Sequence, residues 1–413
     1  MTRVIGLASL LMLILLSNGS DAAPAASADL VKARQFFFGA ENVDARSGAV
    51  DRDKVIFTWL TNSSIGVSLK GRVVLLDSYV NRAETAPGRT PFVVGDLVKL
   101  SPEAIFLGHG HFDHADNAAY IAGKLNIPIY ASEETCVAMQ ADAAALHATT
   151  PPTIDVASVE CHSVTTSGST PGAEIVKLTQ LEPVACITAF RHLHSTTPPP
   201  DKLQLPDYPI VPVINITDPR DVQMYPPGTA FSYRSSGSGG PGGPVSILYQ
   251  FVMRGDRRFT FLWHNTSGAL KEGCAIDRCW GPAVGQQVVD RLSSLPPTDI
   301  ELGSLVSLGF AVTGMRDPIA YQQALHAKIY IPVHQGVAAA PAASLEFKVA
   351  YLKQLDIMGS ARFPLEFRPE PRWMVDPDDY VRPMVYDPKD DRWRKPSGVR
   401  GSGPCSSSRD DDD

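Results

Sequence analysis

The chain has 413 residues, of which 44% are hydrophobic and 20% are charged. This length and composition exclude a disordered or fibrous chain and predict one large globular domain with additions. The formal net charge is −7 and no cluster of Lys and Arg stands out, so nucleic acid is not expected as a main partner. Composition gives no prediction of the oligomeric state.

Residues 1–28 have the features of a secretory signal peptide. Arg3 supplies a positive charge, and the apolar run from Val4 to Leu16 is too short for an ordinary membrane-spanning helix. Small residues at Ala26-Ser27-Ala28 offer a cleavage site. An uncleaved anchor is the alternative for this segment. No later segment is apolar enough to span a bilayer, so we expect an exported protein, periplasmic or extracellular, with no membrane span once mature.

The six cysteines fit an exported protein. Cys274 and Cys279 lie close enough in sequence to close a small loop, and Cys136 with Cys161 is the next pairing that we expect. Sequence alone does not fix the connectivity, so free thiols stay open as an alternative.

The first half of the chain alternates predicted strands and helices. Two strands joined by a turn at Lys70-Gly71 come early, followed by repeated strand and helix patterns. This alternation predicts a layered α/β domain. The expected strands are 55–60, 64–69, 72–77, 104–107 and 127–131, and the expected helices are 31–38, 94–100, 116–125 and 133–146.

The second half repeats strand pairs followed by helices. The expected strands are 186–190, 245–252, 258–263, 298–305 and 327–334, and the expected helices are 286–295, 318–326 and 345–355. Residues 196–244 are too long and too rich in proline and glycine for a plain connection, and we interpret them as an inserted lid-like region. A tolerated surface insertion is the alternative, and it is favoured for 235–243.

We expect a main domain at 29–345 and a C-terminal extension at 346–413. The extension contains aromatic, proline and charged residues that are expected to wrap the surface, and 401–413 reads as a disordered acidic tail. The aromatic residues concerned are Trp373, Tyr380, Tyr386 and Trp393.

The stretch that follows the predicted strand at 104–107 contains several potential metal ligands close together in sequence. His109, His111, Asp113 and His114 place four potential metal ligands within six residues. Histidines two apart can converge on one ion, and the adjacent aspartate and histidine then point toward a second ion. Imidazole and carboxylate are ordinary ligands for zinc and similar divalent metals. The alternative is a polar loop that happens to hold three of the ten histidines.

This His-x-His-x-Asp-His pattern after a hydrophobic strand resembles the signature of the metallo-β-lactamase-fold hydrolases. Over residues 50–340, the resemblance implies an αββα sandwich of two related halves, with one or two zinc or similar ions at one edge between the sheets. The Phe-Arg-His-Leu-His-Ser sequence at 190–195 looks more like the lactonase and phosphodiesterase-like branch. That step rests on analogy.

The resemblance also implies ligands further along the chain. His194 or His192 supplies the third ligand of the first metal; we favour His194 and expect His192 to support the site or face the substrate. His334, in a Pro-x-His sequence after a strand, matches the last ligand of the second metal.

One position departs from the family pattern. Asn265 stands where the family has an aspartate that bridges the two metals, and a neutral amide is a poor bridge between two cations. His264 stands at the preceding glycine position. It is a candidate compensating ligand, or else a residue that supports the site from behind or faces the substrate. Asp77, at a strand end, is expected either to support the metal site from behind or to act as an ordinary strand-end cap.

These residues predict a metal-dependent hydrolase that acts on a small-molecule ester, lactone, amide or phosphoester. Asp113 is the candidate catalytic residue, because it can orient the attacking water while it binds the second metal. A non-catalytic metal-binding protein with a degraded site is the alternative that Asn265 favours. A redox enzyme with two irons is a further alternative, and the missing bridging carboxylate speaks against it.

Overall fold

The computed structural model describes residues 26–80, 92–197, 243–255, 259–305, 308–334, 341–362, 370–371, 381–395 and Cys405. Most of the predicted signal peptide, residues 198–242 of the lid-like region, and the acidic tail lie outside this part of the chain. Trp373 and Tyr380 lie outside it as well.

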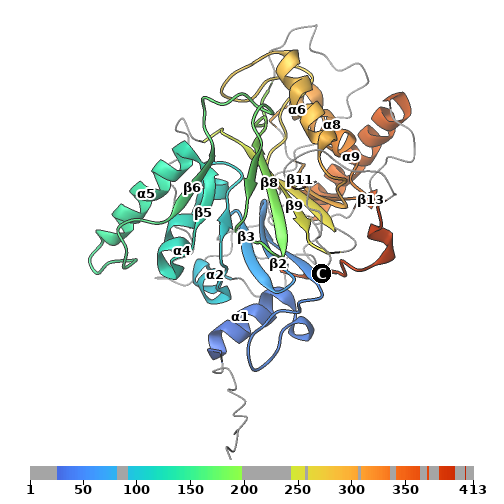
Figure 1. Cartoon of the computed structure of the whole chain (residues 1–413). Coiled ribbons are helices and arrows are strands. Elements are labelled where there is room, and N and C mark those ends of the chain that lie inside the picture. Colours follow the sequence, from blue (N-terminus) through green and yellow to red (C-terminus); the bar gives the residue numbers. More distant parts are fainter. Residues whose placement is uncertain are drawn as a thin grey trace, which may run out of the picture.

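The first half of the chain forms most of a seven-stranded sheet (Figure 1). Its first strands are antiparallel and joined by short turns, whereas its later strands are parallel and joined by helices. In spatial order, the strands are β14 (Pro383–Tyr386), β1 (Val55–Thr61), β2 (Ser64–Leu69), β3 (Arg72–Leu76), β4 (Ile105–Phe106), β5 (Ile129–Ser132) and β6 (Cys161–Thr165).

The second half forms a second seven-stranded sheet with the same order of pairings. Each sheet has three antiparallel pairs followed by three parallel pairs. The strands are β7 (Val176–Leu178), β8 (Ala185–Arg191), β9 (Ile247–Met253), β10 (Thr260–His264), β11 (Ile300–Ser304), β12 (Ile329–Val333) and β13 (Glu370–Pro371). The predicted αββα sandwich of two related halves is therefore confirmed.

Helices cover the outer face of each sheet, so the central strands are buried on both faces (Figure 1). This is why β1 and β9 are buried along their whole length and show no regular alternation of apolar and polar residues. Helices α1 (Ala28–Phe38), α2 (Val94–Leu100), α4 (Ala118–Leu125) and α5 (Glu133–His147) accompany the first sheet. Helices α6 (Pro282–Ser294), α8 (Arg316–Leu325) and α9 (Pro341–Arg362) accompany the second. Among the described helices, none is long and apolar enough to cross a bilayer.

Aromatic side chains join the two sheets in the central layer. Phe57 of β1 contacts Phe261 of β10 at 4.9 Å between ring centroids. Phe106 of β4 contacts Phe251 of β9 at 5.5 Å. The hydroxyl of Tyr249 donates to the carbonyl oxygen of Leu107, just before the histidine motif. The core is thus continuous with the segment that carries the candidate ligands.

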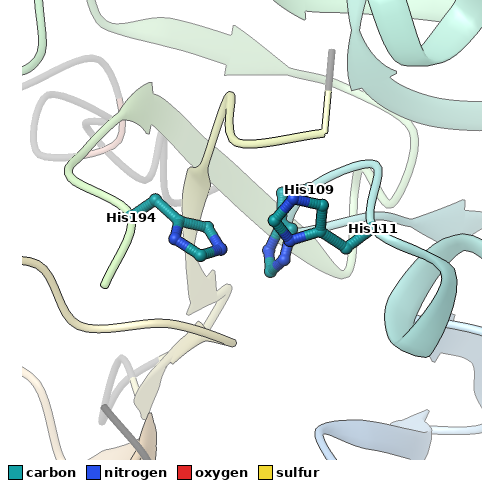
Figure 2. Close-up of side chains that lie close together, drawn as sticks. All are labelled: His109, His111 and His194. Atoms are coloured by element: carbon teal, nitrogen blue, oxygen red, sulfur yellow. The ribbon is translucent and has the colours of Figure 1, made fainter. Parts of the chain in front are cut away.

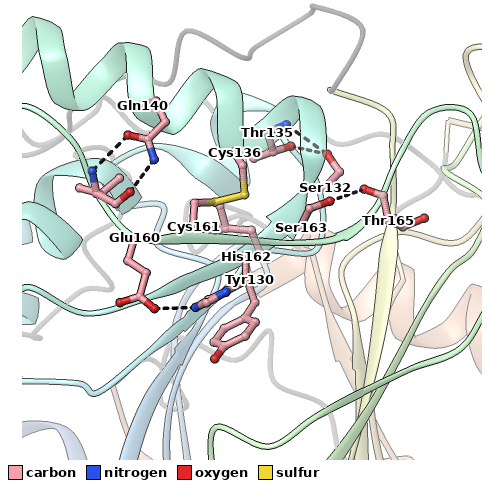
Figure 3. Close-up of a disulfide and its surroundings, with 12 residues drawn as sticks. Tyr130, Ser132, Thr135, Cys136, Gln140, Glu160, Cys161, His162, Ser163 and Thr165 are labelled. Atoms are coloured by element: carbon pink, nitrogen blue, oxygen red, sulfur yellow. Dashed lines mark hydrogen bonds and ion pairs between the residues drawn. A yellow bond between two sulfur atoms is a disulfide. The ribbon is translucent and has the colours of Figure 1, made fainter.

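All six cysteines form disulfides, so the free-thiol alternative is wrong. The two expected pairs, Cys136–Cys161 and Cys274–Cys279, are confirmed, and Cys186–Cys405 is the third. Figure 3 shows the bond that ties α5 to β6, beside which the side chain of Gln140 hydrogen-bonds both backbone polar groups of Val159.

Two aromatic side chains in the described part of the C-terminal segment are buried in the core rather than exposed on the surface. Tyr386 is 3% exposed and Trp393 is 1% exposed, which corrects the expectation for these two residues. Strand β14 pairs with β1, and Cys405 is bonded to Cys186 of β8. Helix α9 also runs across residue 345, where we expected the main domain to end.

Candidate metal centre

The histidine motif lies at the end of β4, where the chain leaves the first sheet. His109 and His111 lie in the loop, and a one-turn helix, α3 (Phe112–Ala115), then carries Asp113 and His114. The helix predicted at 116–125 is α4, which begins at Ala118, because the short helix α3 and a turn after it precede α4.

Gly108 lets this loop pass close to the second sheet. A Cβ added there would lie 2.2 Å from Nδ2 of Asn265, a contact that no larger residue could accept. The side chain of Asn265, which follows β10 of the second sheet, therefore packs directly against the backbone of the metal motif.

Three histidines converge on one point at this edge (Figure 2). The ring centroids of His109, His111 and His194 are 4.7 to 4.8 Å apart, and the rings are nearly perpendicular to one another. One nitrogen from each ring lies within 4.8 Å of the others. The motif supplies two of these rings and the segment after β8 supplies the third, so this first group joins the two halves of the chain.

Hydrogen bonds fix which nitrogen of the first group is available. Nδ1 of His109 lies 2.9 Å from Oδ1 of Asn265, and Nδ1 of His194 lies 2.7 Å from the carbonyl oxygen of Ser195. Because both partners are acceptors, each Nδ1 carries the proton and each Nε2 keeps its lone pair. This is the usual support for a metal-binding histidine.

The structure brings His194 to the first group and places His192 elsewhere. Nδ1 of His192 lies 3.1 Å from the hydroxyl of Tyr321, on α8 behind the second sheet. Residues two apart on a continuing strand would share one face, but β8 ends at Arg191, so the two rings can point in different directions.

A second group lies beside the first. Nε2 of His114 is 3.1 Å from Nε2 of His334 and 3.4 Å from Oδ2 of Asp113, and Oδ2 of Asp113 is 3.5 Å from Nε2 of His334. Tetrahedral ligands at zinc bond lengths are roughly 3.3 Å apart, so these three atoms fit one ion. His109 lies within 4.8 Å of Asp113 and His114, which makes the two groups neighbours.

The buried carboxylate of Asp77 supports both groups from behind. Its Oδ2 accepts from Nδ1 of His114 at 2.7 Å, from the hydroxyl of Ser63 at 2.8 Å and from Nδ2 of Asn265 at 2.9 Å. Its Oδ1 accepts from the backbone N–H of Gly108 at 3.0 Å. Asp77 also has a positive φ of 55°, a conformation uncommon outside glycine. These contacts correspond to a supporting role rather than to a simple strand-end cap.

Asn62 positions the second group, a role that we did not predict. Its side-chain nitrogen donates to Oδ2 of Asp113 at 3.1 Å, and its carbonyl oxygen accepts from the backbone N–H of His334 at 2.9 Å. Asn62 and His334 both have positive φ, at 50° and 68°. The only feature of the sequence at Asn62 was a tight turn between two predicted strands. That turn did not indicate that Asn62 would contact Asp113 and His334.

The electrostatics prepare most of these groups to bind a cation. Burial raises the pKa of Asp113, but His114, His334 and His111 outweigh it and lower that pKa to about 2. Burial and the neighbouring histidines lower the pKa of His194 to about 3 and that of His334 to about 4. The carboxylate is therefore ionised, and these two imidazoles are neutral, at neutral pH.

His114 differs from the other histidines. Burial lowers its pKa, but Asp113 and Asp77 outweigh burial and raise it above the usual value. In the absence of a cation, His114 therefore holds its proton more tightly than the other candidate ligands do.

Asn265 does not lie between the two groups, which corrects the expected bridging position. Its Oδ1 faces Nδ1 of His109, the side of that ring away from Nε2, and its Nδ2 donates to Asp77. Both polar atoms of the amide are thus used in holding other residues. The described residues provide no carboxylate other than Asp113 among the ligand atoms of the two groups.

His264 also lies outside both groups. Its Nε2 is 2.9 Å from Oε1 of Glu301, and its Nδ1 donates to the carbonyl oxygen of Thr266 at 2.8 Å. Burial raises the pKa of Glu301, although the hydrogen bond with His264 opposes this shift. Both ring nitrogens of His264 are engaged by these partners, so His264 is not a compensating ligand. It is also 1% exposed, so it does not face the substrate.

No protein-family model matches this sequence, and no curated protein matches it. Among solved structures, the chain is similar to a metallo hydrolase, Igni18, from Ignicoccus hospitalis, with 12% identity, coverage of 81% of this chain and 98% of the other, and a TM-score of 0.45. It is similar to zinc-bound PqqB from Methylobacterium extorquens, with 12% identity, coverage of 76% and 86%, and a TM-score of 0.35.

A third similar structure is the subclass B3 metallo-β-lactamase BJP-1 of Bradyrhizobium japonicum, with 9% identity, coverage of 60% and 74%, and a TM-score of 0.28. In its own motif, its two related sheets and the order of its candidate ligands, this chain is similar to the metallo-β-lactamase superfamily.

Proposed function

We propose that this protein is a hydrolase that uses one or two zinc ions to cleave an ester, lactone, amide or phosphoester in a small molecule. The observation that carries the proposal is the pair of adjacent ligand groups, His109, His111 and His194 beside Asp113, His114 and His334. Five imidazoles and one carboxylate suit zinc better than a pair of irons that needs bridging carboxylates.

Asp113 is the group that we assign to the attacking water. A divalent ion held here would lower the pKa of a bound water to about 7 and polarise a carbonyl or phosphoryl oxygen. The Asp113 carboxylate, with its pKa near 2, stays ionised and can accept a hydrogen bond from the water. The amide of Asn62 holds one of its oxygens, which fixes the direction in which the other can accept.

The lid-like region at 196–244 is proposed to border the substrate. It begins two residues after His194, and near its other end the carbonyl oxygen of Gly243 accepts from the backbone N–H of Gly110, inside the histidine motif. Both described ends of the region therefore lie at the candidate centre. A segment in this position is suited to select substrates.

Export is proposed on the signal-like N-terminus and the three disulfides. Disulfides persist in oxidising compartments, which fits the periplasm or the extracellular space. The substrate is then a molecule that meets the protein outside the cytoplasm.

A non-catalytic metal-binding protein is the second candidate function. It is favoured because Asn265 is neutral and does not lie between the two groups, so it supplies no bridging carboxylate. The two candidates differ in turnover. We would compare zinc-loaded parent protein with the Asp113→Asn variant on a panel of esters, lactones, amides and phosphodiesters. The proposal expects hydrolysis that chelation abolishes, that zinc restores and that the variant loses by at least about a hundredfold. Zinc binding without turnover of any panel member would favour the non-catalytic candidate.

A further inference from the structure

A buried histidine–glutamate pair joins two neighbouring strands behind the candidate centre. His264 ends β10 and Glu301 lies on the adjacent parallel strand β11, and they are 1% and 0% exposed. Their side chains meet at 2.9 Å. Burying two ionisable groups is costly unless each is well paired, so this pair calls for an explanation.

The pair fixes the turn that follows β10. With its Nε2 held by Glu301, His264 directs Nδ1 back to the carbonyl oxygen of Thr266, two residues along the chain, at 2.8 Å. The imidazole of His264 therefore links β11 to the backbone of the turn, through one hydrogen bond to Glu301 and one to Thr266.

That turn in turn holds two ligands of the first group. Asn265 accepts from Nδ1 of His109 at 2.9 Å. The hydroxyl oxygen of Thr266 accepts from the backbone N–H of Ser195 at 2.9 Å, and the carbonyl oxygen of Ser195 accepts from Nδ1 of His194 at 2.7 Å. One short turn thus sets the orientation of rings that come from both halves of the chain.

We propose that His264 and Glu301 are positioning residues that hold His109 and His194 ready for the first metal through the turn at 265–266. The inference rests on the proposed function only in taking these two histidines as ligands. It gives His264 a role that neither a metal ligand nor a substrate contact would have.

The space around the pair supports this role. A Cβ added at Gly303, opposite His264 on β11, would lie 2.7 Å from Oε1 of Glu301 and 2.8 Å from Nε2 of His264. The strand therefore has room for the pair only because residue 303 has no side chain. Gly303→Ala changes no polar group and yet disturbs the pair, which makes it an independent probe.

The test compares Glu301→Ala, Glu301→Gln and Gly303→Ala by cobalt titration, which reports the coordination of the first ion in its visible spectrum. Loss of supporting hydrogen bonds typically weakens metal affinity by about 10- to 100-fold, and we expect such a loss in Glu301→Ala and Gly303→Ala. Glutamine can still donate to Nε2 of His264, so Glu301→Gln should retain most of the parent affinity. The weaker binding should be confined to the first ion.

A matched control separates positioning from general destabilisation. Glu272→Ala removes a different buried carboxylate, which pairs with Arg316 at the start of α8. It should lower the melting temperature and leave the cobalt affinity unchanged. Glu301→Ala with the affinity and spectrum of the parent would overturn the proposal.

A readout without metal keeps the inference separate from the proposed function. In metal-free protein, ¹⁵N-resolved NMR should show His109 and His194 with the proton on Nδ1 in the parent and in Glu301→Gln, and a mixture of tautomers in Glu301→Ala. Unchanged tautomers in Glu301→Ala would contradict the positioning role, even if the parent hydrolyses every substrate offered. Changed tautomers in a protein without turnover would uphold it while the proposed function fails.

Discussion

Asp77 and Asn265 occupy equivalent positions in the two sheets, since each follows the fourth strand from the antiparallel edge of its sheet. They meet directly, with Nδ2 of Asn265 donating to Asp77. An aspartate at position 265 would set two buried carboxylates against each other, and a like-charge contact of this kind is unfavourable. The amide is therefore suited to its place, and the departure from the family pattern has a physical reason.

Most candidate ligands could be predicted because their signal is local. His109, His111, Asp113 and His114 fall in one short motif, and His194 and His334 each follow a predicted strand. The supporting contacts could not be predicted in this way. Asn62 meets Asp113 across 51 positions and Glu301 meets His264 across 37, and only the assembled sheets bring them together.

The pKa shifts predict that the two ions differ in their response to acid. His194 has a pKa of about 3, so protons compete little for the first group at mildly acidic pH. The pKa of His114 is raised by Asp113 and Asp77, so a proton must leave before the second ion binds. Metal binding therefore weakens as protons occupy this ligand.

Lowering the pH from about 8 to about 6 should therefore release the second ion first. Zinc titrations followed by calorimetry at both pH values would measure this. Equal weakening of the two binding events, or earlier loss of the first, would contradict the predicted order.

At the scale of the elements, two turns support the two ligand groups. The turn between β1 and β2 provides Asn62 and Ser63 to the second group, and the turn after β10 provides Asn265 and Thr266 toward the first. Nε1 of Trp263 donates to the carbonyl oxygen of Ser63 and links the two turns. The strands were predictable from their apolar runs, whereas their pairing across the sandwich was not.

The three disulfides close loops of very different length, which predicts the order in which their removal destabilises the fold. The bonded cysteines are separated by 219, 25 and 5 positions in Cys186–Cys405, Cys136–Cys161 and Cys274–Cys279. Loop entropy gives roughly 5, 3 and 2 kcal/mol for them. Denaturant unfolding of the three double Cys→Ala variants would test the ranking. A larger loss from the Cys274–Cys279 pair than from Cys186–Cys405 would contradict it.

At the scale of the whole molecule, described parts of the C-terminal segment contact both sheets of the sandwich. Strand β14 extends the first sheet beside β1, and Trp393 packs against Phe259 of the second half at 5.0 Å between ring centroids. The sequence suggested a surface wrap because this segment is rich in proline and charge. Tyr386 contacts Phe57 and Trp393 contacts Phe259, partners more than a hundred positions away that local patterns cannot reveal.

Trp393→Ala should therefore lower the free energy of unfolding by roughly 3 to 5 kcal/mol, the usual cost of emptying a buried aromatic site. Val385→Ala on β14, where the side chain is 38% exposed, is the control and should cost less than about 1 kcal/mol. Urea denaturation would compare the two. Equal, small losses would show that the C-terminal segment adds little to the fold.

The measurement that tests the central claim most directly is the zinc content of the purified full chain, followed by titration to saturation. Two adjacent ligand groups predict two ions per chain, the first bound more tightly than the second. His194→Ala should remove the first ion and His334→Ala the second. A chain that holds no zinc and takes up none on titration would contradict the account of this site as a metal centre.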